Sequence, residues 1–251
     1  MTTYLLLFAA SIGGGLFGSL LGLGGGIILV PVYTLLFKMP VIQAVSLSLC
    51  TIMATSVTAS TKFLTSGLVD LKVALDMEIT TIIGSFVGAL AAGWIGPQAL
   101  TLVFSAVILY AAFATLIPRQ EGDGSDYEPS RKRYGFAVGI SVFSVAIVGL
   151  LGIGGGVVKV PILHLLLHKS IKEAVATSAL MVGITTCTAV IPYFSRGEVR
   201  IEYVPYAALG TICGAYVGSR VLHRISSLYL KLLFSGVLIY TALRMILKAL
   251  G

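Results

Sequence analysis

Charged side chains are scarce in this 251-residue chain, which is 11% charged and 57% hydrophobic. Soluble domains carry about 25% charged residues, and a soluble fold of this length has too much surface to hide so many apolar side chains. The three cysteines, Cys50, Cys187 and Cys213, form no CxxC pair and lie inside apolar runs, which favours neither a disulfide framework nor a metal site. These shortages point to an all-α polytopic membrane protein.

Catalytic signatures are missing as well. No serine stands in the G-x-S-G pattern of a rhomboid-like protease, and no H-E-x-x-H pattern offers a zinc site. Carboxylates are nearly absent from the middle of the apolar runs. We therefore expect no enzyme, no metal and no cofactor. The 17 Lys and Arg residues, against 10 Asp and Glu, fall in short clusters between apolar runs, which favours orientation in a membrane over binding of nucleic acid.

Eight apolar runs follow one another along the chain. A straight membrane span needs about 20 residues, so most runs fit one helix each. The first and fifth runs are far longer, and each is interrupted by three consecutive glycines. The pattern predicts a multi-pass protein of the plasma membrane, in contact with the lipid bilayer. The runs cover residues 4–37, 41–66, 73–95, 98–118, 134–168, 171–194, 203–222 and 226–249.

The two halves of the chain are similar to each other. Aligning them without a gap places Leu21–Gly26 on Leu151–Gly156, and Val30-Pro31 on Val160-Pro161. The pattern predicts a first transmembrane repeat over residues 1–118, a hydrophilic linker over 119–133 and a second repeat over 134–251. Internal repeats are common in secondary transporters, whose sites lie where the repeats meet.

The direction of the second repeat depends on how the two long runs are threaded. If each crosses the membrane once, the halves are parallel. If each is re-entrant, the halves are inverted. The distribution of Lys and Arg slightly favours inverted repeats, with both termini outside and the linker in the cytoplasm.

The two glycine clusters predict breaks in helices at membrane depth. Glycine costs about 1 kcal/mol relative to Ala in a helix, and freed backbone groups survive in a membrane only where protein or a polar cavity satisfies them. Half-helices starting near Ile27 and Val157 would point their amides and positive dipole ends at such a cavity. Close helix packing is the alternative for a single cluster, but two clusters in register favour an anion site. Its predicted glycines are Gly24, Gly25, Gly26, Gly154, Gly155 and Gly156.

The repeated element resembles the TauE/SafE family of membrane anion permeases, also called the sulfite exporter family. It stands as Gly22-Leu-Gly-Gly-Gly-Ile-Ile-Leu-Val-Pro31 and again as Gly152-Ile-Gly-Gly-Gly-Val-Val-Lys-Val-Pro161. The resemblance covers nearly the whole chain. It implies transport of small sulfur-containing anions such as sulfite, sulfoacetate and related sulfonates.

Lys159 is the strongest single candidate for a residue of the anion site. It lies three positions after the second glycine cluster, where the first half has Leu29. A charge at membrane depth usually faces a cavity or a partner. One reading makes Lys159 the positive charge that draws the anion into the site, and the other pairs it with a carboxylate such as Asp76, Glu78 or Glu202.

Hydroxyl side chains recur at helical spacing in the second and sixth runs. They could replace the hydration shell of an oxyanion, or they could bond to the backbone of their own helix. The candidates are Ser48, Thr51, Thr55, Ser178 and Thr185.

The site suggests transport by alternating access, with a proton or sodium ion as a coupling ion and the oligomeric state left open. An anion channel, or a permease for another small anion, is the alternative function.

Overall fold

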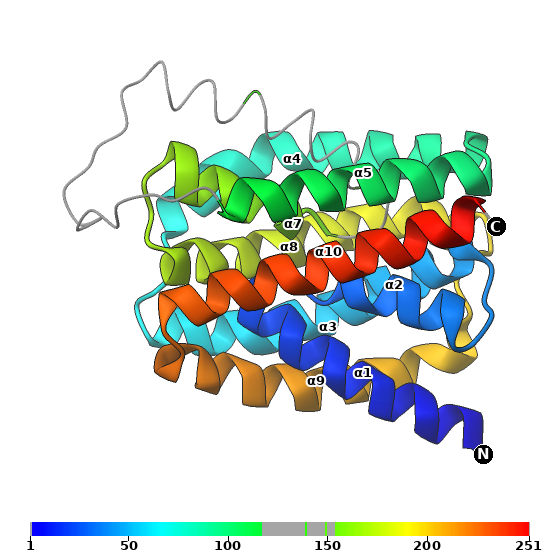
Figure 1. Ribbon diagram of the computed structural model, residues 1–251, viewed down its shortest axis with the longest axis horizontal. Helices are drawn as coiled ribbons and strands as arrows, with labels where there is room; N and C mark the ends of the chain where they lie inside the picture. The colour runs from blue at the N-terminus through cyan, green and yellow to red at the C-terminus, as the bar shows by residue number, and fades with distance from the viewer. Residues whose placement is uncertain (1, 117–138, 140–148, 150–153, 251) are drawn as a thin grey trace.

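The computed structural model describes residues 2–116, 139, 149 and 154–250, and these residues form helices and turns without a β-strand. Most helices lie side by side along the long axis of the molecule (Figure 1). In chain order they are α1 Thr2–Leu21, α2 Gly26–Leu35, α3 Val41–Thr65, α4 Leu71–Ala91, η1 Ala92–Trp94, α5 Pro97–Leu116, α7 Gly156–Pro161, η2 Ile162–Leu166, α8 Ile171–Ser195, η3 Ile201–Tyr203, α9 Val204–Val221, η4 Leu222–Arg224 and α10 Ser227–Leu250.

Glycine sets the start of both half-helices. α2 follows Gly25, whose φ is 94°, and α7 follows Gly155, whose φ is 88°. This left-handed conformation is open to glycine and strained for residues with a Cβ. The helices expected to start near Ile27 and Val157 begin one residue earlier, so this prediction is confirmed.

Polar caps set the start of two long helices. The Asp70 carboxylate accepts a hydrogen bond of 3.1 Å from the Val73 amide at the start of α4. At the start of α8, Ser170 and Glu173 form a capping box, in which each side chain accepts a hydrogen bond from the other residue's amide.

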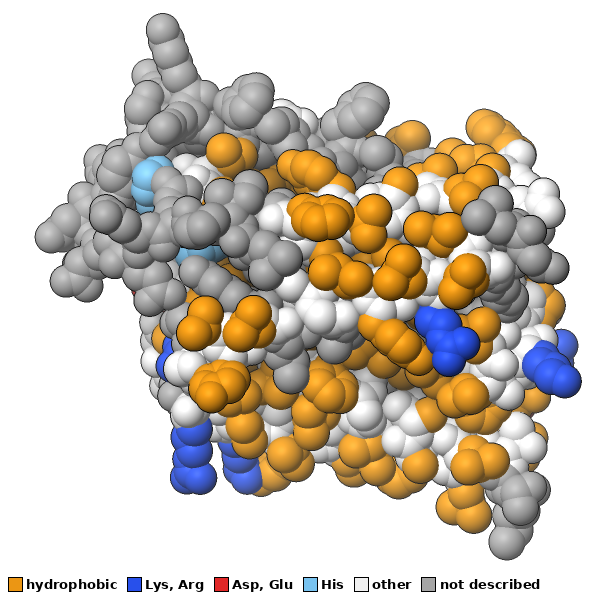
Figure 2. Space-filling view, in the orientation of Figure 1, with side chains coloured by type: hydrophobic (Ala, Val, Ile, Leu, Met, Phe, Trp, Pro, Cys, Tyr) orange, Lys and Arg blue, Asp and Glu red, His pale blue; other side chains and the backbone are white. Residues whose placement is uncertain are grey.

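Within the described residues, four helices are long and apolar enough to cross a membrane, judged by length and composition: Thr3–Leu21, Val41–Thr65, Leu71–Trp94 and Ile171–Ser195. On the face in Figure 2, apolar side chains cover much of the surface between the ends of the molecule, and most of the visible Lys and Arg side chains lie toward those ends. This distribution is typical of a protein that crosses a bilayer. The expected number of eight apolar segments stays a prediction.

α3 and α8 pack against each other and run in opposite directions. Ser46, near the start of α3, donates a 2.8 Å hydrogen bond to the carbonyl of Glu198, which follows α8. At the other end, the amide of Asp70, which follows α3, donates at 3.0 Å to Thr177, near the start of α8. The bounds of the two helices coincide in the gapless alignment of the halves. Two stretches that this alignment relates are therefore antiparallel.

The α1–α2 segment enters and leaves at one end of the molecule. At the start of α1, Tyr4 stacks on Tyr206 near the start of α9, with ring centroids 4.6 Å apart. α2 then leads back through Pro40 to the start of α3, the end at which α8 finishes. Figure 1 places both chain termini toward this end. A re-entrant first run is what inverted repeats require, although the repeat itself stays a prediction, and the predicted 119–133 linker lies outside the described residues.

Candidate functional site

The two glycine turns meet inside the molecule. A Cβ built on Gly156 would lie 2.4 Å from the carbonyl oxygen of Gly22, which leaves no room for a side chain. Gly24 and Gly154 both lie against the same two side chains, Ile52 of α3 and Val182 of α8. The predicted glycines of both halves are thus brought together between the antiparallel helices.

The first turn closes on the end of α1. The amides of Leu23 and Gly24 both donate to the carbonyl of Gly18, at 3.0 and 3.2 Å. A Cβ on Gly25 would lie 2.6 Å from the carbonyl oxygen of Gly14, and no side chain caps α2. Gly26, the first residue of α2, is buried. The turn is therefore held by backbone contacts that only glycines allow.

Lys159 is fully buried and folds back over the second turn. A Cβ on Gly155 would lie 3.2 Å from the Lys159 Cε, so the ammonium lies beside the start of α7. Its Nζ donates to Glu78 Oε2 at 2.8 Å, to the Met181 carbonyl at 3.3 Å and to Thr185 Oγ1. Of the two interpretations of Lys159, pairing with a carboxylate is therefore observed in the structure, and the carboxylate is that of Glu78.

Glu78 is a functional candidate that the sequence indicated only as one of three possible partners of Lys159, and not as a site residue. It lies on the buried face of α4 and is 2% exposed, while Asp76 lies on the exposed face. Thr81 donates to Glu78 Oε2 at 3.0 Å and Thr185 donates to Oε1. The expectation that carboxylates are nearly absent from the middle of the spans was wrong at this position. The buried spacing of Ala74, Met77, Glu78 and Thr81 is the signal that could have found it.

The predicted hydroxyls divide into four groups. Thr51 and Thr55 of α3 donate to backbone carbonyls of their own helix, at 2.8 and 3.0 Å. Ser178 donates to the Gly22 carbonyl at 2.8 Å and so holds the first turn, whereas Thr185 belongs to the Lys159–Glu78 cluster. In the part of the chain that the structure describes, the buried Ser48 hydroxyl has no hydrogen-bond partner. Only Thr185 among them contacts a charged group of the described chain.

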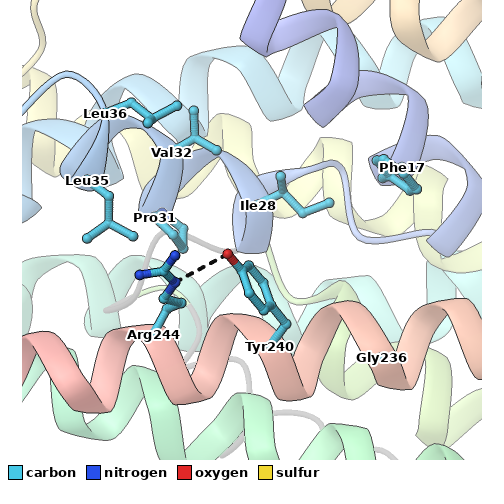
Figure 3. Close-up of a pocket in the computed structure, with 9 residues that line it drawn as sticks. All are labelled: Phe17, Ile28, Pro31, Val32, Leu35, Leu36, Gly236, Tyr240 and Arg244. Atoms are coloured by element: carbon cyan, nitrogen blue, oxygen red, sulfur yellow. Dashed lines mark hydrogen bonds between the residues drawn. The ribbon is translucent and has the colours of Figure 1, made fainter.

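A separate cavity of about 700 Å³ opens between α1, α2 and α10 (Figure 3). Its lining is mainly apolar, and Arg244 points into it with Nε 3.2 Å from the Tyr240 hydroxyl. None of the predicted site residues lines this cavity, and the Lys159–Glu78 cluster is not part of it.

The other ion pairs of the described chain lie at helix ends. Lys169 lies 2.6 Å from Asp70, Arg196 lies 2.9 Å from Glu198, and Arg200 lies 3.3 Å from Glu202. Partial burial raises the pKa of Asp70. The Lys169 ammonium and the cap at the start of α4 lower the pKa by more than burial raises it, so the pKa is below its ordinary value. The Lys159–Glu78 pair therefore differs from these three ion pairs because it is buried deep inside the molecule.

The sulfite exporter TauE/SafE family model matches residues 7–245. The chain belongs to this family. It is 27% identical over 246 residues to the "Probable membrane transporter protein YunE" of Bacillus subtilis, covering 87% of each chain. It is 26% identical over 248 residues to the "Probable membrane transporter protein MJ0441" of Methanocaldococcus jannaschii, covering 93% of this chain and 91% of the relative.

A second Bacillus subtilis relative, "Probable membrane transporter protein YdhB", is 25% identical over 213 residues and covers 84% of this chain and 87% of its own. No solved structure matches the chain. Membership and the apolar helices together establish a multi-pass membrane protein of a transporter family, which confirms the resemblance seen in the sequence.

Proposed function

We propose that this TauE/SafE protein carries small anions across the membrane by alternating access, with sulfur-containing anions such as sulfite or organosulfonates as substrates. The observation that carries the proposal is Lys159, a fully buried cation at the start of a glycine-broken helix. The name of the family supports the substrate class, and the antiparallel α3 and α8 support inverted repeats.

The proposed anion site is centred on the Lys159 ammonium and the start of α7. Gly155 provides backbone close to the Lys159 side chain, Gly154 and Gly156 flank it in the same turn, and Thr185 provides a hydroxyl. The turn of Gly24, Gly25 and Gly26 supports this backbone from the other half. Thr51, Thr55 and Ser178 then act mainly by holding α3 and the first turn in place, whereas Ser48 makes no hydrogen bond within the described chain.

A carrier fits this arrangement better than a channel. The two turns are in contact at Gly22 and Gly156, so an open path does not pass between them. Saturable exchange of anions between the inside and the outside of liposomes would support a carrier, whereas unitary currents in single-channel recording would support a pore.

A binding screen tests the substrate class. Purified protein is heated with sulfite, sulfate, thiosulfate, sulfoacetate, methanesulfonate or acetate, because a ligand that binds the native state raises the melting temperature. We expect sulfite or a sulfonate to raise it more than acetate does. Equal shifts for all six anions, or none, would contradict the proposal.

Variants of Lys159 test the site. A charge about 4 Å from an anion contributes on the order of 4 kcal/mol at an effective dielectric near 20, and desolvation offsets part of this. A net loss of about 1–3 kcal/mol predicts binding weakened roughly 5- to 150-fold in Lys159→Ala, partly retained in Lys159→Arg and lost most fully in Lys159→Glu.

Lys159→Ala also leaves Glu78 buried without its partner, which destabilises a fold by about 3–5 kcal/mol. The double variant Lys159→Met with Glu78→Gln removes both charges and preserves the fold, so it should melt near wild type while binding weakly. Lys72→Ala, an exposed lysine at the start of α4, is the control. Wild-type affinity in the double variant would remove Lys159 from the site.

A further inference from the structure

The carboxylate of Glu78 occupies the place beside Lys159 where the proposed anion would bind. Both of its oxygens are used: Oε2 accepts from Lys159 and Thr81, and Oε1 accepts from Thr185. Thr185 also accepts from the Lys159 ammonium, so its hydroxyl bridges the two charges. The anion and Glu78 would therefore compete for the same donors.

Charge balance decides how that competition can be resolved. Both side chains are almost completely buried, and a lone charge at membrane depth is costly. The ionised pair is neutral as it stands. Adding a monovalent anion would leave a net negative charge, and adding a proton to Glu78 alone would leave a net positive charge. Adding both together keeps the cluster neutral.

We propose that Glu78 is the proton-binding group that couples anion movement to protons, and that Lys159 is the shared counter-charge of Glu78 and the anion. The inference rests on the proposed function. A proton from water bonds to one carboxylate oxygen of Glu78, the ion pair with Lys159 breaks, and a monovalent anion takes the place of the carboxylate. Release of the anion restores the ion pair and returns the proton to water on that side.

The groups around the pair support a single titrating site. α7 contributes Lys159, α4 contributes Glu78 with the Thr81 hydroxyl, and α8 contributes the Thr185 hydroxyl and the Met181 carbonyl. Asp76 of α4 lies on the exposed face. In the part of the chain that the structure describes, the remaining ion pairs lie at helix ends. One proton per anion is thus the expected ratio.

The test uses wild-type protein with methanesulfonate, a monovalent anion that neither gains nor loses a proton between mildly acidic and mildly alkaline pH. For methanesulfonate, apparent binding should weaken by up to about tenfold for each rise of one pH unit, because one proton is bound with each anion. In proteoliposomes, a trapped pH dye should report a proton moving with each methanesulfonate, and an imposed pH gradient should drive its accumulation.

Glu78→Gln keeps the size of the side chain and abolishes its titration. We expect this variant to bind methanesulfonate at alkaline pH as tightly as wild type does at acidic pH, without pH dependence and without proton movement. Glu198→Gln, which removes a carboxylate that pairs with Arg196 at a helix end, should keep the wild-type pH dependence.

The outcomes separate the coupling from the proposed function. If wild-type protein binds none of the screened anions, the proposed function fails and the coupling fails with it. If it transports anions without pH dependence or proton movement, only the coupling is overturned. The wild-type dye measurement decides the point even where Glu78→Gln does not fold, and retained proton coupling in a folded Glu78→Gln protein also overturns it.

Discussion

Ser48 and Ser178 hold equivalent positions in the two halves, yet their hydroxyls are in opposite situations. Ser178 donates to the Gly22 carbonyl at 2.8 Å, whereas the buried Ser48 hydroxyl has no partner among the described residues. Removal of a buried hydrogen-bond partner costs about 1–3 kcal/mol, whereas loss of an unpaired hydroxyl costs little. The two serines therefore form a matched pair for mutation.

We expect Ser178→Ala to lower the melting temperature in detergent and Ser48→Ala to leave it unchanged or raise it slightly. Both changes remove one oxygen from a buried position, so each serves as the control for the other. Equal losses in the two variants would mean that the Ser178 hydrogen bond does not hold the first turn.

The sequence predicted Lys159 of the central ion pair, but it left the partner open among three carboxylates. Lys159 stands out because its surroundings are apolar and its counterpart is Leu29. Glu78 has Ala208 as its counterpart, so it departs from the repeat in the same way. The sequence could not choose among Asp76, Glu78 and Glu202 as the partner, because that choice depends on which helix faces pack around Lys159.

At the scale of elements, the glycine turns are the part of the fold that the sequence predicts best. Three consecutive glycines break a helix whatever packs around them, so the starts of α2 and α7 follow from local chemistry. The packing of one turn on the other could not be predicted, because it depends on contacts of Gly22 with Gly156 across the two halves.

Two glycines separate the effect of backbone strain from the effect of close packing. Gly25 and Gly67 both have positive φ, at 94° and 68°. A Cβ on Gly25 would lie 2.6 Å from the Gly14 carbonyl oxygen, whereas a Cβ on Gly67 would meet nothing within 4 Å.

We expect Gly67→Ala to cost about 1–2 kcal/mol from its backbone conformation alone. Gly25→Ala should lower the melting temperature further and impair transport, because the backbone of α1 must also move. Similar losses of stability in the two variants, with transport intact in both, would show that the first turn tolerates a side chain.

At the scale of the whole molecule, the antiparallel α3 and α8 give a decisive test of topology. Thr65 ends α3 and Ser195 ends α8, and both are exposed. Parallel repeats would place these two equivalent positions on one side of the membrane, whereas inverted repeats place them on opposite sides.

We expect Thr65→Cys and Ser195→Cys, each in a background without Cys50, Cys187 and Cys213, to react with a membrane-impermeant thiol reagent from opposite sides. Lys38→Cys, in the exposed turn before α3, should react from the same side as Ser195→Cys. Reaction of Thr65→Cys and Ser195→Cys from the same side would restore parallel repeats.

Among the residues that the structure describes, the buried ion pair occurs once, although α3 and α8 have equivalent bounds in the two halves. Two inverted halves can exchange their conformations to open a site alternately to each side, and equal halves would give two states of equal free energy. Glu78 and Lys159 remove that equality, because Ala208 and Leu29 cannot form the same pair in the exchanged state. Under the proposed mechanism, the Michaelis constants for the anion measured from the two faces of the membrane differ. Without a pH gradient or a membrane potential, the anion concentrations on the two sides still become equal at equilibrium.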